Sequence, residues 1–314
     1  MATKIRAAFR PRSLAPHSSP TPLEPQPALA AALRLRELWL KREDRAGGNK
    51  IRGLEFLLAG TEPKSVFVTV GASGSTHCLA TARLAGSLDC HTVVAVFPQP
   101  ETDASRHIAD AMGAAATLVV RASSQLTLPW AVLRAWRAAH HLGQGRPRWI
   151  AGGGADPRAV VGHLLATLEL TEQLGAASPP DTIVAPLGTG GTAAGIALGL
   201  AWLGWTTRVV AVRVAPRIVA NQWRVLRLAR RTAGLLRRSG VDFSIARSSM
   251  RLEVVDAIGK GYGHPTEEGE RARALAAQYG IRLDPTYGAK AFSFFLRHDP
   301  KIQRAIFWHT FAWP

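Results

Sequence analysis

Lys50 has the sequence surroundings that a reactive amine needs. It follows a Gly-Gly-Asn turn ending at Asn49, and it opens a predicted helix over residues 51–60. The positive end of a helix dipole disfavours an ammonium ion, so the pKa of this lysine is predicted to be low. A neutral lysine amine attacks aldehydes to form a Schiff base. Taken alone, the stretch fits a solvated surface lysine better, so the other motifs must decide.

Two strand-to-helix turns are rich in small residues whose backbone amides can bind an anion. The first ends with Ser75, Thr76 and His77 at the start of a predicted helix, where a carboxylate could bind. In the second, glycines let successive N–H groups converge and two hydroxyl groups add donors, which suits a terminal phosphate. This second turn consists of Gly188, Thr189, Gly190, Gly191 and Thr192.

A nucleotide site is an alternative for the turn at residues 188–192. The turn lacks both the Gly-Lys-Ser/Thr ending of a P-loop and the GxGxxG spacing of a dinucleotide-binding turn. The next strand ends near Arg213, where an NAD enzyme would place a carboxylate and an NADP enzyme could use an arginine. The phosphate of another cofactor therefore fits the turn better.

Two of the three tyrosines, Tyr262 and Tyr287, lie in turns near the C-terminus. They belong to residues 259–266 and 280–291, which flank a predicted helix. Tyrosine is as commonly a residue of the core boundary as a functional group. These two are therefore candidates only in combination with the other motifs.

The elements that must position these residues alternate between short β-branched runs and helical patterns, which predicts an α/β fold with a largely parallel sheet. A chain of 314 residues that is 47% hydrophobic is long enough for two domains. A glycine- and proline-rich stretch predicts a junction near residues 145–160. Predicted strands cover residues 66–70, 92–97, 116–120, 182–186 and 208–214, and predicted helices cover 51–60, 77–86, 104–113, 130–141, 159–174, 192–203 and 266–279.

The formal charge of +17 raises the question of nucleic-acid binding, because clustered arginines neutralise phosphates. The densest basic stretch, residues 219–239, carries Arg224, Arg227 and Arg231 at helical spacing, and Trp223 and several leucines alternate with them. This pattern predicts a solvated helix face over an apolar one. Since 32 of the 39 basic residues are arginines, the charge looks like a bias of the whole composition, and the sequence argues against a nucleic-acid partner.

The cellular compartment is predicted to be the cytoplasm. Cys78 and Cys90 are the only cysteines, which fits a reducing environment. The most apolar stretch, residues 193–205, is shorter than the roughly 20 residues of a membrane-spanning helix. The first 22 residues are basic and acid-poor like a transit peptide, but four prolines oppose the amphipathic helix that such peptides form. We expect no membrane span and no metal site.

In order and spacing, these elements resemble the fold-type II pyridoxal-phosphate (PLP) enzymes of the 1-aminocyclopropane-1-carboxylate deaminase and D-cysteine desulfhydrase family. The resemblance implies a two-domain α/β fold like that of the tryptophan synthase β subunit, with twisted, parallel-rich sheets flanked by helices. Residues 1–60 and 161–314 would form the large PLP-binding domain, and residues 61–160 the small α/β domain. A homodimer is also implied. The segments that carry the resemblance are residues 19–24 (SPTPLE), 41–44 (KRED), 48–50 (GNK), 75–77 (STH), 188–192 (GTGGT), 261–263 (GYG) and 284–291 (DPTYGAKA).

The resemblance also assigns roles at the cofactor. Lys50 would hold PLP as a Schiff base, and Asn49 would fix the ring region. Thr76 would face the ring, and Gly188, Thr189, Gly190, Gly191 and Thr192 would bind the phosphate. The catalytic candidates besides Lys50 are Ser75, which would face the substrate carboxylate, and Tyr262 and Tyr287, which would line the substrate side.

Two residues depart from the family pattern. Thr76 replaces the asparagine that bonds the phenolic oxygen of the cofactor, and Gly288 replaces a Thr, Ser or Glu that meets the pyridine nitrogen. Without that partner the nitrogen stays unprotonated and the ring is a weaker electron sink. β-Elimination tolerates this, because the leaving group accepts electron density, whereas racemisation and ring opening depend on a stabilised carbanion.

We therefore expect a PLP-dependent lyase or deaminase that converts a small amino acid to a 2-oxo acid and ammonia, as D-cysteine desulfhydrase does. Cyclopropane ring opening, racemisation or β-replacement on the same cofactor is the first alternative. A PLP-binding protein with little catalysis is the second.

Overall fold

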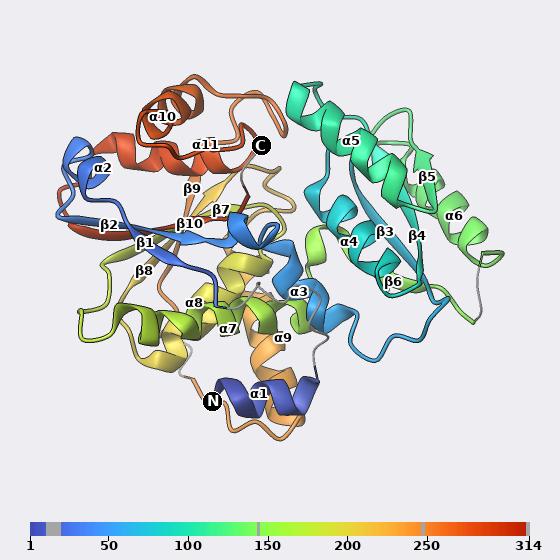
Figure 1. Cartoon of the computed structure of the whole chain (residues 1–314), viewed down its shortest axis with the longest axis horizontal. Coiled ribbons are helices and arrows are strands. Elements are labelled where there is room, and N and C mark those ends of the chain that lie inside the picture. Colours follow the sequence, from blue (N-terminus) through green and yellow to red (C-terminus); the bar gives the residue numbers. More distant parts are fainter. Residues whose placement is uncertain (11–19, 143–144, 246–248, 312–314) are drawn as a thin grey trace.

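Two separate sheets, each flanked by helices, make up the computed structural model (Figure 1). The structure describes residues 1–10, 20–142, 145–245 and 249–311. Part of the segment that resembles a transit peptide therefore lies outside the described residues, as do Ser19 and the C-terminal tripeptide. The prediction of an α/β fold with parallel-rich sheets is confirmed.

The large sheet has six strands in the order β1-β2-β10-β7-β8-β9. Every pair of neighbours is parallel except β1 and β2. Two of its central strands, β7 and β10, are buried along their whole length, because helices cover both faces of the sheet. The strands are β1 (Leu23–Pro25), β2 (Glu37–Arg42), β7 (Thr182–Leu187), β8 (Arg208–Arg213), β9 (Leu252–Asp256) and β10 (Arg304–His309).

The small sheet has four parallel strands in the order β5-β4-β3-β6. These strands are β3 (Val66–Ala72), β4 (His91–Phe97), β5 (Leu118–Arg121) and β6 (Arg148–Ile150). All four lie within residues 61–160, the segment for which we propose a domain of its own. Helices α4 (Thr76–Gly86), α5 (Asp103–Ala115) and α6 (Leu128–Ala139) cover this sheet.

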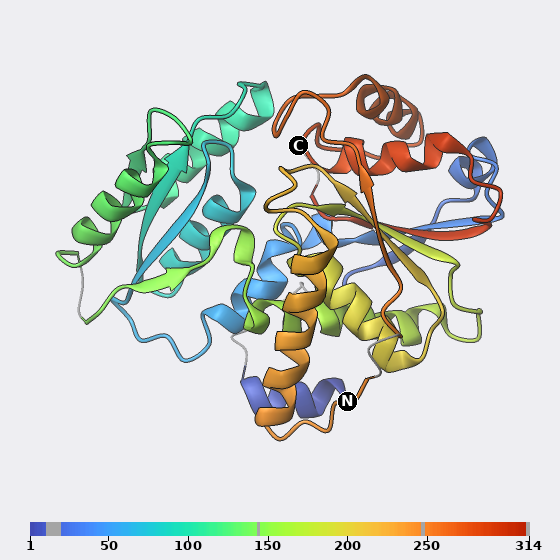
Figure 2. The same ribbon diagram turned by 180° about the vertical axis from the view of Figure 1, so that it is seen from behind.

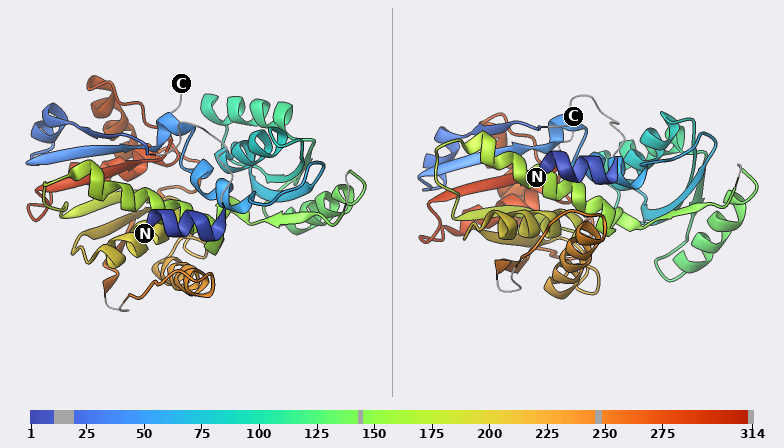
Figure 3. Two further views of the ribbon diagram at one scale, coloured as in Figure 1. Left: turned by 60° about the horizontal axis from the view of Figure 1, so that its bottom comes forward. Right: turned by 90° about the horizontal axis from the view of Figure 1, so that it is seen from below.

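Helices cover both faces of the large sheet, and Figure 3 shows these layers from the side. One layer contains α1 (Ala2–Phe9), α7 (Pro157–Leu174), α8 (Gly191–Leu203) and α9 (Gln222–Arg238). The other contains α2 (Pro27–Ala32), α10 (Glu267–Gln278) and α11 (Gly288–Phe292). None of the helices in the described residues combines the length and apolar character that crossing a bilayer requires.

Two glycines let the helices of the candidate site approach α7 closely. Helix α3 (Lys50–Leu57) crosses α7 where a Cβ on Gly162 would collide with the carbonyl oxygen of Arg52. Helix α8 crosses α7 where a Cβ on Gly195 would collide with His163. Because α3 begins at Lys50 and α8 begins in the glycine-rich turn, α7 fixes both turns relative to each other.

Candidate active site

Lys50 is the first residue of α3, and its side chain points into the interior, with Nζ 3.5 Å from the carbonyl oxygen of Gly153. Burial lowers the pKa of Lys50 to about 8. The direction agrees with the sequence analysis, but the cause there was the helix dipole, whereas here it is the loss of water around the ammonium group. The amine is thus partly neutral near physiological pH.

A buried network of ion pairs holds α3 in place. Arg52, two residues after Lys50, pairs with Glu43 at 3.0 Å and with Glu169 of α7 at 2.6 Å. Lys41 of β2 also pairs with Glu169, at 2.6 Å, and Thr21 donates its hydroxyl to Glu43. Each charge in the network has a partner of opposite sign. Moving α3 would leave a buried charge without its partner, which costs free energy, so the network holds the helix in place.

The turn at residues 188–192 lies directly beside Lys50. The amide nitrogen of Asn49 donates to the hydroxyl of Thr192 over 2.7 Å, and both side chains are buried. The hydroxyl of Thr189 donates to the carbonyl of Gly153, the same group that lies near Lys50 Nζ. The amine and the predicted phosphate turn are therefore parts of one site.

The same turn is built to receive an anion. Gly190 takes a positive φ of 95°, which a side chain would oppose, and serves as the N-cap of α8. Its backbone leaves the first N–H groups of α8 without a side-chain cap, at the positive end of a 13-residue helix. A phosphate group beside a lysine amine fits these residues.

Ser75 and Thr76 begin α4 on the opposite side of the site. Ser75 is the N-cap, and its hydroxyl accepts the N–H of Cys78 at 3.3 Å. Thr76 lines a small recess together with Tyr287 and Phe311. The start of α4 and the turn that carries Tyr287 thus line the same recess.

Tyr262 and Tyr287 form a hydrogen-bonded pair, with their hydroxyl oxygens 2.6 Å apart and their rings edge to face. Burial raises the pKa of Tyr262 to about 12, and the pKa of Tyr287 lies well above its usual value for the same reason. The ring of Tyr287 also lies against Gly188, 3.5 Å from the position of a Cβ there. Both phenols are neutral hydrogen-bond donors in the site.

Sequence reasoning missed the groups that hold these tyrosines. Lys290, which is fully buried, donates to the carbonyl oxygens of Ile258 at 2.8 Å and Gly261 at 3.2 Å, and so holds the turn that carries Tyr262. Asp284 accepts the backbone N–H groups of residues 286, 287 and 288. Both residues lay within or beside quoted motifs, but nothing in their spacing revealed these partners.

Two buried histidines near Lys50 had no predicted role. His77 bonds the hydroxyl of Thr69 through Nε2, and burial together with the charge of Lys50 lowers the pKa of His77 to about 3. His163 of α7 is buried beside Gly191, and its pKa is lowered to about 3 by the same causes. Both imidazoles are neutral, and His163, in the middle of a helix, gave no sequence signal.

The family departures persist in three dimensions. Gly288 leaves no side chain after Tyr287, and a Cβ there would lie 2.9 Å from Asp284 Oδ2. Burial raises the pKa of Asp284 to about 6.

Within the described residues, no group of three or more His, Cys, Asp or Glu side chains could hold a metal ion.

Comparison with known proteins gives consistent matches. Residues 14–310 match the family model described as pyridoxal-phosphate dependent enzyme. D-cysteine desulfhydrase from Salmonella choleraesuis is 31% identical over 285 residues, which cover 88% of this chain and 84% of that protein. The enzyme of the same name from Klebsiella pneumoniae strain 342 is 32% identical over the same shares.

Solved structures also match this chain over nearly its whole length. An ACC deaminase homologue superposes with a TM-score of 0.78 and 27% identity, covering 99% of this chain and 95% of that one. Serine racemase from Dictyostelium discoideum superposes with a TM-score of 0.62, 19% identity and coverage of 99% and 98%, which is a likeness of fold alone.

Proposed function

The chain belongs to the pyridoxal-phosphate dependent enzyme family, and we propose that it removes the β substituent of a small amino acid, D-cysteine or a close relative, to release a 2-oxo acid and ammonia. The observation that carries this proposal is the meeting of Lys50, the 188–192 turn and the Tyr262–Tyr287 pair in one site that lacks a side chain at Gly288. The identity to D-cysteine desulfhydrases supports the choice of substrate.

The residues of the site fit PLP. Lys50 Nζ would bind its aldehyde carbon, the turn at residues 188–192 its phosphate, and Asn49 and Thr76 the region of its ring. When bound, PLP supplies an electron sink that acidifies the proton on Cα of an amino acid.

The chain's own groups would then handle the substrate and its protons. Ser75 and the N–H groups that open α4 would bind the substrate carboxylate, where the helix dipole favours negative charge. Lys50, whose pKa of about 8 leaves part of its amine neutral, would accept the Cα proton at Nζ. In the tyrosine pair one hydroxyl donates to the other, so one hydroxyl hydrogen remains free to assist the departing group.

Lys50→Ala and product analysis test this function. The protein loaded with PLP should release sulfide, a 2-oxo acid and ammonia in equal amounts from D-cysteine, and Lys50→Ala should release none. A 2-oxo acid formed from 1-aminocyclopropane-1-carboxylate without sulfide from D-cysteine would favour ring opening. A borohydride-reducible visible absorbance with no amino acid consumed would leave only a PLP-binding protein.

We also propose that the enzyme acts in the cytoplasm as a homodimer. The chain has only two cysteines, both buried, which fits a reducing compartment, and the family resemblance supports the dimer. Light scattering of the purified protein gives the assembly directly, and a monomer at working concentration would contradict the proposal.

A further inference from the structure

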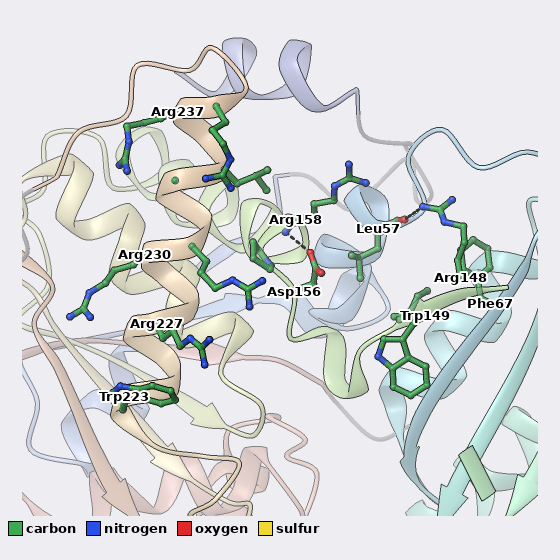
Figure 4. Close-up of a pocket in the computed structure, with 16 residues that line it drawn as sticks. Leu57, Phe67, Arg148, Trp149, Asp156, Arg158, Trp223, Arg227, Arg230 and Arg237 are labelled. Carbon is green, nitrogen blue, oxygen red and sulfur yellow. Dashed lines mark hydrogen bonds between the residues drawn. The ribbon is translucent and has the colours of Figure 1, made fainter. Parts of the chain in front are cut away.

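A wide basic groove lies between α9 and the chain that leaves β6. Figure 2 shows the course of these two segments. Its volume is about 870 Å³. Figure 4 shows arginines projecting from both walls. The arginines that line it are Arg148 of β6, Arg158 of α7, and Arg227, Arg230, Arg231, Arg237 and Arg238 of α9.

The charge of this groove is uncompensated. Within the described parts of the chain, none of the α9 arginines that line the groove forms an ion pair. The one acidic lining residue, Asp156, accepts the backbone N–H of Arg158 at the start of α7. Like charges within about one Debye length, roughly 10 Å, repel one another, so the groove carries a positive potential.

Two exposed tryptophans accompany these arginines. Trp223, the second residue of α9, is 62% exposed, with the guanidinium of Arg227 over its ring at 5.1 Å. Trp149 of β6, on the other wall, is 46% exposed. The sequence pattern placed Trp223 on the apolar face of its helix, and this expectation is wrong, because the ring lies on the groove side with the arginines.

We propose that this groove binds a single strand of nucleic acid, with phosphates along α9 and bases against Trp223 and Trp149. The α9 arginines that line the groove extend from Arg227 to Arg238, over about 16 Å of helix, with Gly234 and Leu235 between the two ends. A row of this length fits the repeated phosphates of a polymer better than the compact charge of a free nucleotide. Exposed indole rings stack on unpaired bases, whose faces a duplex does not offer.

A second copy of the chain is a poor occupant of this groove. Its net charge is also +17, and it would bring the same basic face to the contact. The sequence alone argues against a nucleic-acid partner. The fold favours one, because it places Arg148 and Arg158 opposite the basic face of α9. It is independent of the function proposed for Lys50.

Fluorescence anisotropy with a labelled single-stranded oligo-dT, and with the matching oligo-rU, tests the proposal on the PLP-loaded protein. The logarithm of the affinity should fall with the logarithm of the salt concentration by about 0.7 for each phosphate contacted. Arg227→Glu/Arg231→Glu should weaken binding at least about tenfold and flatten this slope. Trp223→Ala should weaken binding at least about fivefold with the slope unchanged.

The matched control is Arg137→Glu/Arg271→Glu, which makes the same change of charge at exposed arginines outside the groove. It should change the affinity less than about threefold. An equal loss in this control would show attraction to net charge alone and overturn the proposal. Equal affinity for a duplex, or equally effective competition by ATP or poly-glutamate, would overturn it too. Arg227→Gln/Arg231→Gln removes the same two charges. If this variant retains the PLP absorbance, a loss of oligonucleotide binding does not come from misfolding.

Discussion

The amide of Asn49 and the hydroxyl of Thr192 are joined by a buried hydrogen bond of 2.7 Å. This bond ties the residue before Lys50 to the last residue of the glycine-rich turn, over 143 positions of the chain. The bond thus links the position of Lys50 to that of the anion-binding turn. A substitution at Asn49 or at Thr192 should affect both.

Thr192→Val should therefore weaken PLP binding. The substitution keeps the shape but leaves the Asn49 amide unpartnered, which should raise the dissociation constant of PLP about three- to tenfold. Equilibrium dialysis against PLP measures this. Thr232→Val removes a buried hydroxyl that bonds the backbone of α9 and serves as the control. Equal weakening in both variants would contradict a specific role for the Asn49–Thr192 bond.

Tyr262→Phe should slow turnover without loss of the cofactor. It removes one hydroxyl of the tyrosine pair, and positioned proton donors contribute typically about 10²–10⁴-fold to rate. We expect kcat for D-cysteine to fall within that range while the PLP absorbance stays. Tyr279→Phe changes the third tyrosine, at the end of α10, and should leave kcat within about twofold. A normal kcat in Tyr262→Phe would remove this residue from the mechanism.

Arg52→Met should destabilise the fold strongly. It leaves Glu43, which has no exposed surface, without its cation. Breaking a buried pair in this way costs about 3–5 kcal/mol of the free energy of unfolding, measured in urea. Arg36→Met breaks an exposed pair with Glu37 and should cost less than about 1 kcal/mol. Similar losses in the two variants would mean that burial of the network contributes little.

Capture of PLP should follow the lowered pKa of Lys50. The neutral amine is the reactive form, so the initial rate of PLP binding should rise with pH and level off above about 8 rather than above about 10.5. Stopped-flow absorbance between pH 6.5 and 9.5 measures the profile. The control Lys301→Met should keep the same pH profile, and Lys50→Met should abolish covalent capture of PLP. A rate still rising steeply at pH 9.5 would contradict the effect of burial.

The local parts of the site could be predicted from the sequence because they are bracketed by glycines between a strand and a helix. Lys50 and the turn at residues 188–192 are of this kind. Their shared partner could not be predicted, since Gly153 comes from a stretch whose only sequence signal was a junction. His163 and the interior strand β10 gave no signal, because their places depend on contacts between segments far apart in the chain.

The groove illustrates the same limit. The periodicity of Arg227 and Arg231 correctly predicts a helix with a basic face, and α9 spans Gln222–Arg238. The second wall comes from Arg148 and Arg158, whose meeting with α9 depends on how the small sheet sits against α7. Tertiary packing therefore decides whether a basic helix face is merely solvated or lines a binding groove.

Gly288→Thr should shift the reaction toward exchange at Cα. On the family resemblance, a side chain here meets the ring nitrogen of PLP and strengthens the electron sink. Deuterium incorporated at Cα of the remaining D-cysteine, relative to 2-oxo acid formed, should rise in the variant, as NMR in D₂O would show. A longer-lived carbanion is reprotonated more often before the β substituent leaves.

Gly288→Thr should also lower the free energy of unfolding. Comparison with Gly288→Ala separates this effect from the effect on the reaction. A Cβ at residue 288 lies 2.9 Å from Asp284 Oδ2, a carboxylate fixed by three backbone N–H groups, so crowding should cost about 1–3 kcal/mol. Gly288→Ala adds the same Cβ without a hydroxyl and should lose similar stability while its exchange ratio stays at the wild-type value. If Gly288→Ala raised the exchange ratio as much as Gly288→Thr, displacement of Asp284 rather than the new hydroxyl would control the fate of the substrate.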